Sequence, residues 1–275
     1  MSNAGPYDID DLLQLMARLR DPDSGCPWDC QQDYRSLVAY TVEEVYEVVD
    51  AVERSDFAHL SEELGDLLFQ VVFFARIAEQ EGRFDFAAVV DGIVRKLLVR
   101  HPHVFPDGSL GSRRGADVVA MEEVKEQWEN IKQRERHGKG HGRLLADIPA
   151  ALPALMRAQK IQKRVAKIGF DWDSIDGVVV KTREELAELE VALASADQDA
   201  IADELGDLLF CCVNLARHAG GDAETLLRRA TLKFEARFAQ MEVLAEAGNA
   251  SLADFDAAGL DGLWRAVKAK SPGPA

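Results

Sequence analysis

The sequence predicts an all-α protein in which two repeated four-helix domains are joined by a partly helical linker. Two observations lead to this prediction. Apolar residues recur at the helical spacing i, i+3, i+4 and i+7, while the alternation typical of strands is scarce. In addition, the seven residues that begin at Glu63 recur unchanged from Glu204, 141 positions later. A match of this length at a single offset indicates two copies of one domain.

The same offset predicts where one helix of each copy begins. It aligns Thr41 with Thr182 and Glu44 with Glu185. Threonine followed three residues later by glutamate is the capping-box pattern, in which each side chain bonds the other residue's backbone N–H. We therefore expect a helix to begin at each of these threonines.

Glycine and proline mark the expected domain boundaries. Residues 1–115 form the first domain, and 116–148 form a linker with one polar helix at 117–136. Residues 149–275 form the second domain, after a glycine-rich break and Pro149. In each copy the last helix is expected to begin just after an aspartate, Asp85 or Asp222.

The charge balance limits the kinds of partner. The 275 residues include 48 acidic and 32 basic side chains, a formal net charge of −16. This excess argues against a nucleic-acid or anionic-membrane partner, which would require a basic surface. No apolar stretch is long enough to cross a membrane. Four cysteines without a secretion signal predict a cytoplasmic, reducing location.

Four acids of the second copy are predicted to lie beside the core. On a helical wheel of the first helix, Glu185 and Glu188 border the apolar stripe. On the wheel of the second helix, Glu204 and Asp207 lie in the same sector as apolar residues such as Leu208. Burying several carboxylates costs several kcal/mol per charge unless protonation or a cation neutralises them. Carboxylate oxygens suit Mg²⁺, with Mn²⁺ as an alternative. The first copy repeats the set with Glu44, Glu47, Glu63 and Asp66. The alternative is that these acids lie at the edges of their helices and have only a structural role.

Glycines and basic residues extend this interpretation. Gly65 and Gly206 lie within the second acid pair of each copy, where glycine weakens a helix, and they suggest close approach by another helix or a ligand. Two basic pairs are spaced four apart and so share a helical face, which suits phosphate but also a solvated surface; they are Lys96 with Arg100, and Lys233 with Arg237. Three tryptophans could stack on a base or lie in the core, namely Trp28, Trp172 and Trp264.

These residues carry a family resemblance. Glu-Glu-x-x-Glu at 184–188 followed by Glu-x-x-Asp at 204–207 resembles the motif of the MazG-type nucleoside triphosphate pyrophosphohydrolases. The wider chain is similar to the tandem two-domain bacterial members. The matching stretches are GCPWD (25–29), YTVEEVYEV (40–48), GRFDF (82–86), RHPHVF (100–105), LPALMRAQKIQKR (152–164) and GFDW (169–172).

The resemblance implies a homodimer with intertwined helices and Mg²⁺-dependent hydrolysis of NTP or dNTP to the monophosphate and diphosphate. It implies that Glu184 and Glu185 are catalytic. The implied metal ligands are Glu185, Glu188, Glu204 and Asp207. The implied nucleotide-binding residues are Lys181, Thr182, Arg183, Glu184, Glu185, Asp203, Asp207, Lys233, Arg237, Trp264 and Lys268.

The second copy is expected to be the main site, because Tyr40 stands in the first copy where the second has Lys181. The first copy nevertheless keeps a full set of candidates, Glu44, Glu47, Glu63, Asp66, Lys96 and Arg100. The expected role is nucleotide-pool housekeeping or stress control. Two alternatives stay open: a pyrophosphatase selective for dUTP or dCTP, and a non-catalytic helical scaffold that binds nucleotide or metal to regulate a partner.

Overall fold

The computed structural model divides the chain into two compact units, Met1–Glu135 and Arg136–Ala275. It describes residues 6–113, 115, 120–124, 127–128, 131 and 143–270. Within these residues the regular secondary structure is helical and no strand occurs, which confirms the predicted fold class. None of the described helices combines the length and the apolar character required to cross a membrane.

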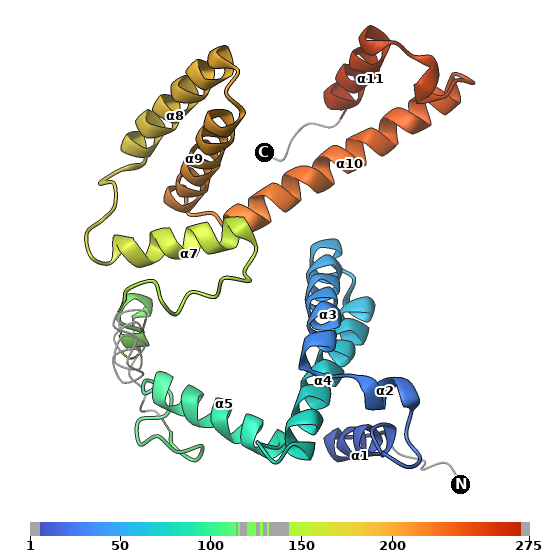
Figure 1. The fold of residues 1–275 in the computed structure, drawn as a ribbon, viewed down its shortest axis with the longest axis vertical. Helices are drawn as coiled ribbons and strands as arrows, with labels where there is room; N and C mark the ends of the chain where they lie inside the picture. Colours follow the sequence, from blue (N-terminus) through green and yellow to red (C-terminus); the bar gives the residue numbers. More distant parts are fainter. Residues whose placement is uncertain are drawn as a thin grey trace. The chain divides into compact units, whose positions relative to one another are not determined.

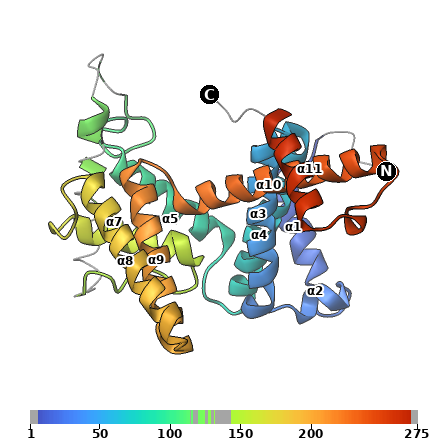
Figure 2. The same ribbon diagram turned by 90° about the horizontal axis from the view of Figure 1, so that it is seen from above.

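The first unit is built on a long helical hairpin (Figure 1). Its helices are α1 (Ile9–Leu19), α2 (Pro27–Gln31), α3 (Tyr34–Arg54), α4 (Phe57–Gln80) and α5 (Phe86–Arg100). Helices α3 and α4 pack along each other, and α1 packs on α4. The second unit contains α7 (Ala154–Ala166), α8 (Ile175–Ser195), α9 (Gln198–His218), α10 (Ala223–Ala247), the short 3-10 helix η1 (Leu252–Asp254) and α11 (Ala257–Lys270). Helices α8 and α9 form the matching hairpin, while α11 lies against α10 (Figure 2).

The two hairpins turn in the same way. Helix α3 ends at Arg54 and α8 at Ser195, and the residues that follow them, Ser55 and Ala196, both lie in the left-handed region with φ of 57° and 56°. The next residue, Asp56 or Asp197, caps the following helix with its carboxylate. These positions are again 141 apart, so the repeat extends to the backbone geometry of the turn.

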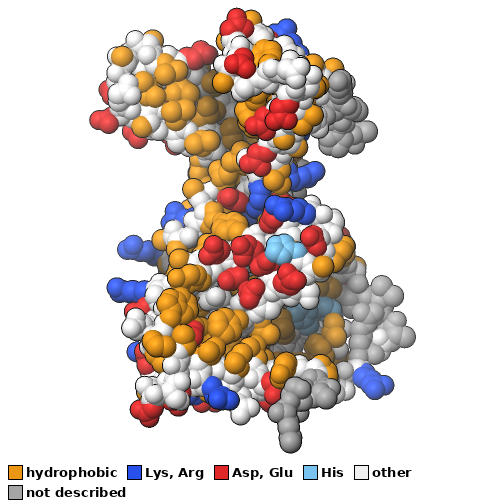
Figure 3. Space-filling model, turned by 90° about the vertical axis from the view of Figure 1, so that its right-hand side faces the viewer, with side chains coloured by type: hydrophobic (Ala, Val, Ile, Leu, Met, Phe, Trp, Pro, Cys, Tyr) orange, Lys and Arg blue, Asp and Glu red, His pale blue; other side chains and the backbone are white. Residues whose placement is uncertain are grey.

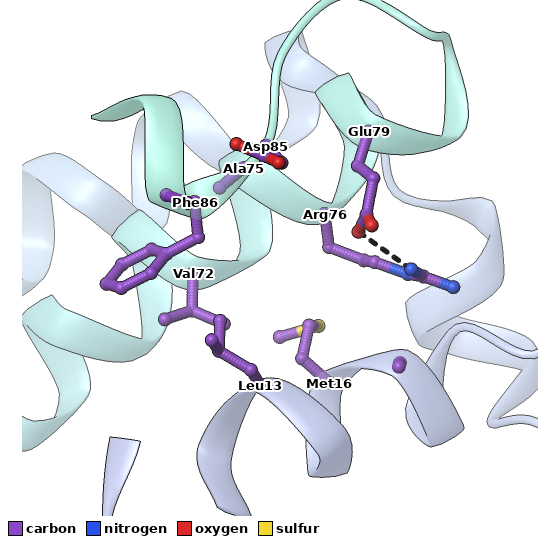
Figure 4. Close-up of a pocket in the computed structure, with 10 residues that line it drawn as sticks. Leu13, Met16, Val72, Ala75, Arg76, Glu79, Asp85 and Phe86 are labelled. Atoms are coloured by element: carbon purple, nitrogen blue, oxygen red, sulfur yellow. Dashed lines mark hydrogen bonds and ion pairs between the residues drawn. The ribbon is translucent and has the colours of Figure 1, made fainter. Parts of the chain in front are cut away.

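The core of the first unit lies where α1, α3 and α4 meet. It consists of Met16, Leu37, Val72, Phe73 and Ile77. A cavity of about 280 Å³ opens beside it between α1, α4 and the start of α5 (Figure 4). At its edge the Arg76 guanidinium pairs with Glu79 at 2.8 Å. The equivalent Arg217 of the second unit pairs instead with Asp171, so the two copies have diverged around a shared arginine.

The capping-box prediction is wrong. Helix α3 begins at Tyr34 after the cap Asp33, and α8 begins at Ile175 after Ser174. Thr41 and Thr182 therefore lie two turns inside their helices. Each hydroxyl donates to the carbonyl four residues earlier, that of Leu37 at 2.9 Å and of Val178 at 2.8 Å. This back-bonding lets threonine sit inside a helix, which its local pattern does not reveal.

Other local predictions have mixed outcomes. Asp85 and Asp222 do cap the helices that they were expected to begin, α5 and α10, but α10 is not the last helix of its copy, because η1 and α11 follow it. Besides the helical residues around 121–131, each unit has five described α-helices where about four were expected: α2 has only five residues, and α11 follows the helix that was expected to be the last of its copy. No atom lies within 4 Å of a Cβ built on Gly65 or Gly206, so the expected close approach does not occur among the described residues. The predicted linker helix lies partly outside the described residues; 121–124, 127–128 and 131 are helical.

Candidate metal and nucleotide site

The acids of the second copy meet where α8 packs on α9. Carboxylate oxygens of Glu185, Glu188 and Glu204 all lie within 4.8 Å of one another. Glu185 is only 5% exposed, whereas Glu188 is exposed and Glu204 half-buried. The cluster therefore runs from the hairpin interior to its surface.

These carboxylates repel one another. Burial raises the pKa of Glu204 above its usual value, and the neighbouring charges of Glu188, Glu185, Asp207 and Asp203 raise it further. Asp207 thus lies near the cluster, although it is outside the closest group of three. The same electrostatic cost that protonation relieves would be relieved by a divalent cation.

A lysine already meets this cluster. The Lys181 Nζ lies 2.6 Å from Oε1 of Glu184 and 2.7 Å from Oε1 of Glu185. The hydrogen bonds that the Lys181 ammonium donates to these two carboxylates hold the pKa of Lys181 well above its ordinary value. An open groove of about 500 Å³ runs beside the acids, and its walls include Glu184, Glu188 and Glu204. Of the other predicted nucleotide ligands on this hairpin, Thr182 is half-buried while Arg183 and Asp203 are exposed.

The first copy builds a related cluster between α3 and α4. Oxygens of Glu44, Glu63 and Asp66 lie within 4.8 Å of one another. Burial is the main cause that raises the pKa of both Glu44 and Glu63, with neighbouring carboxylates adding to it, and the Glu47 charge is the largest of these for Glu63. Acidic side chains gather on one face of this unit beside a histidine (Figure 3).

The structure adds three neighbours that the sequence reasoning missed. The His59 Nδ1 lies 3.1 Å from Oε1 of Glu63. Gln70 is 7% exposed, and its amide nitrogen lies 3.5 Å from Oε1 of Glu44. The equivalent of Gln70 in the second copy is Cys211, whose thiol pKa is raised by burial and then by the charge of Glu185. Gln70 and Cys211 each follow the cluster aspartate by four residues, a same-face spacing that could have indicated them.

The predicted phosphate and base ligands of the second copy form a separate group on α10 and α11. The Arg237 guanidinium carbon lies 6.0 Å from the Trp264 ring centre, and Phe234 packs on the same ring at 5.2 Å. Lys233 and Lys268 are exposed on these two helices. Among the described residues, no hydrogen bond or ion pair joins this group to the acids of α8 and α9. In the first copy, Lys96 and Arg100 lie on α5, with Lys96 exposed and Arg100 half-buried.

Each of the two units is all-α and brings carboxylates together between two paired helices. The protein therefore belongs to a class of helical proteins that contain the same acidic site twice. Residues 32–105 and 175–241 match the family model of the MazG nucleotide pyrophosphohydrolase domain. The chain is 49% identical over 262 residues to the nucleoside triphosphate pyrophosphohydrolase of Escherichia coli K12, covering 94% of this chain and 97% of that one. It is 39% identical over 260 residues to the nucleoside triphosphate pyrophosphohydrolase/pyrophosphatase MazG of Thermotoga maritima, covering 94% and 95%. The chain belongs to the MazG family.

Proposed function

We propose that the protein hydrolyses NTP and dNTP to the monophosphate and diphosphate, mainly at the second copy. The observation that carries this proposal is the carboxylate cluster of Glu185, Glu188 and Glu204 beside an open groove. The family membership and the relatives described as nucleoside triphosphate pyrophosphohydrolases support the reaction.

The donor set of this cluster suits a hard divalent cation. Three carboxylates within 4.8 Å, with Asp207 nearby, offer oxygen ligands and a negative charge that the one ammonium of Lys181 offsets only in part. Mg²⁺ is the proposed ion and Mn²⁺ the alternative. A bound ion supplies neutralisation of the triphosphate and a water of lowered pKa.

The chain's own side chains then position the reactants. Lys181 donates to Glu184 and Glu185, and its ammonium would be able to turn to a phosphate oxygen if Glu185 held an ion. Glu184 is exposed and lines the groove, where its carboxylate can orient a water and accept its proton. The water oxygen bonds to the α-phosphorus, the bond to the bridging oxygen breaks, and diphosphate leaves.

A homodimer would bring the second set of ligands to this site. Apolar side chains are exposed on α9 and α10, among them Leu205, Leu209 and Phe238. The Gly206 position faces open space within one chain, which leaves room for another helix. We propose that a second copy covers this surface and that the basic group of α10 and α11 meets the acids in the dimer.

The proposed setting is the cytoplasm, with a role in nucleotide-pool housekeeping or stress control. All four cysteines are free thiols, as suits a reducing compartment.

A product assay tests the function. The full chain with Mg²⁺ and each common NTP and dNTP should release diphosphate and not orthophosphate. Glu185→Gln and Asp207→Asn should lower release by about 100-fold or more, since each removes a charge that the proposed ion requires. Glu190→Gln, an exposed acid of the same helix, is the matched control. Full activity in Glu185→Gln would refute the assignment to the second copy, and Glu44→Gln measures the share of the first copy.

A further inference from the structure

The two acidic clusters differ in the basic side chain that contacts their carboxylates. In the second copy, Lys181 occupies Oε1 of Glu185 at 2.7 Å. The first copy has Tyr40 at this position, and its ring packs edge-on against Trp28 at 5.7 Å between centres. The described basic side chain that contacts the first cluster is His59, at Glu63. The position that brings an ammonium to the second cluster therefore carries a phenol ring in the first, which adds no ammonium there.

A buried amide adds a neutral ligand to the first cluster. Gln70 is 7% exposed, and its carboxamide nitrogen faces Oε1 of Glu44 at 3.5 Å, which is too long for a strong hydrogen bond. Its Oε1 is buried and has no hydrogen-bond partner among the described residues. A half turn of the amide exchanges its oxygen and nitrogen, and an amide oxygen is an accepted ligand of hard cations. The side chain is therefore suited to turn its unpartnered oxygen to an ion held by the carboxylates.

We infer that the first copy holds a divalent-cation site that binds free Mn²⁺ or Mg²⁺ more tightly than the second copy does when no nucleotide is present. Its ligands are Glu44, Glu63, Asp66 and Gln70. In the second copy an ion must first displace the Lys181 ammonium, and nucleotide phosphate compensates the displaced lysine only when substrate is bound. The comparison rests on the proposed cation-binding role of the second cluster.

Binding of Mn²⁺ to the full chain without nucleotide tests the inference. The loss of the free-ion electron paramagnetic resonance signal should show a tight and a weak class of sites. We expect affinities that differ by about tenfold or more. Glu44→Gln with Asp66→Asn should remove the tight class, and Glu188→Gln with Glu204→Gln should remove the weak class. Loss of the tight class in the protein that carries Glu188→Gln and Glu204→Gln would overturn the inference.

An exchange of the two distinguishing residues is the sharper test. Tyr40→Lys should weaken the first site, and Lys181→Tyr should strengthen the second, so the double variant should reverse the order of affinities. Both side chains reach solvent, so neither change fills the core. An unchanged order in a variant with wild-type helical content by circular dichroism would refute the role of the lysine.

Gln70 is tested by replacing its oxygen while keeping its volume. Gln70→Met should weaken the tight class about tenfold, because it removes one oxygen ligand, and should leave the weak class unchanged. Unaltered tight binding would exclude Gln70 as a ligand. These readouts are independent of turnover, so failure of the proposed hydrolysis would appear in the product assay and failure of this inference in the Mn²⁺ titration.

Discussion

The Nζ atom of Lys181 lies 2.7 Å from Oε1 of Glu185, which is 5% exposed. The ion pair joins a proposed nucleotide ligand to a proposed metal ligand on one face of α8. A buried carboxylate is thus neutralised before any ion or substrate arrives. This arrangement predicts that Lys181 leaves the Glu185 carboxylate and pairs with a phosphate oxygen when the nucleotide binds.

Loss of this lysine should destabilise the protein without metal. Lys181→Met leaves Glu185 buried and unpaired, which should lower the free energy of unfolding and the melting temperature in EDTA. Mg²⁺ should restore most of the loss, because the ion takes over the carboxylate. Thermal denaturation with EDTA and with Mg²⁺ measures both effects. Lys160→Met, a change at an exposed lysine of α7, is the control. Equal melting temperatures of Lys181→Met and wild type in EDTA would contradict the structural role of the pair.

The raised pKa of Glu204 predicts how the metal-free protein responds to pH. A carboxyl whose pKa is higher in the folded state favours folding less once it ionises, so this contribution declines as pH rises from the unfolded pKa through the folded one. Glu204→Gln removes this penalty and should raise the melting temperature in EDTA at pH 7.

The same substitution should abolish most of the stabilisation that Mg²⁺ gives to the second unit. Glu190→Gln, which removes an exposed charge from α8, controls for net charge. A melting temperature of Glu204→Gln in EDTA that is lower than that of wild type at neutral pH would show that Glu204 is favourably paired and would contradict the prediction.

Asp171 should stabilise the second unit at neutral pH, and this contribution should decrease as pH falls. Hydrogen bonds from Arg217 and His218 hold its pKa well below the usual range, with Arg217 the larger cause. Such a group contributes stability above its unfolded pKa and loses it as pH falls through the folded value. Asp171→Asn should therefore cost about 1–3 kcal/mol at pH 7 and progressively less toward pH 2–3. Urea denaturation at both pH values measures the difference, and Asp173→Asn at an exposed neighbour is the control. A cost that does not depend on pH would exclude the ion pair as its source.

Gly206 tests the proposed dimer surface. An alanine and a methionine both favour a helix over glycine, and neither meets an atom of the same chain at the Cβ position. In a dimer that packs on this face, Gly206→Met should shift the protein toward monomer and reduce diphosphate release, while Gly206→Ala should have a smaller effect. Sedimentation velocity measures the mass. A Gly206→Met protein that keeps the mass of the wild-type assembly would place the interface elsewhere.

Much of the architecture follows from the sequence because it depends on local patterns. The 141-residue offset reports the two copies, and helical periodicity reports the fold class and the position of Glu185 beside the core. The aspartate caps at Asp85 and Asp222 are equally local, since each carboxylate bonds the first turn of its own helix. A family resemblance carried by consecutive residues leads to the same family that the comparisons show.

Only the tertiary structure decided how the helices meet. The packing of α3 on α4 and of α8 on α9 determines which acid is most buried. It is Glu63 in the first copy and Glu185 in the second, although these positions are not equivalent in the repeat and the two hairpins turn in the same way. Packing across helices also brings Gln70 to Glu44 and keeps the group around Arg237 and Trp264 on its own pair of helices. Periodicity describes one helix at a time, whereas contacts between helices depend on turn geometry and side-chain packing, and it is these contacts that distinguish two clusters built from the same motif.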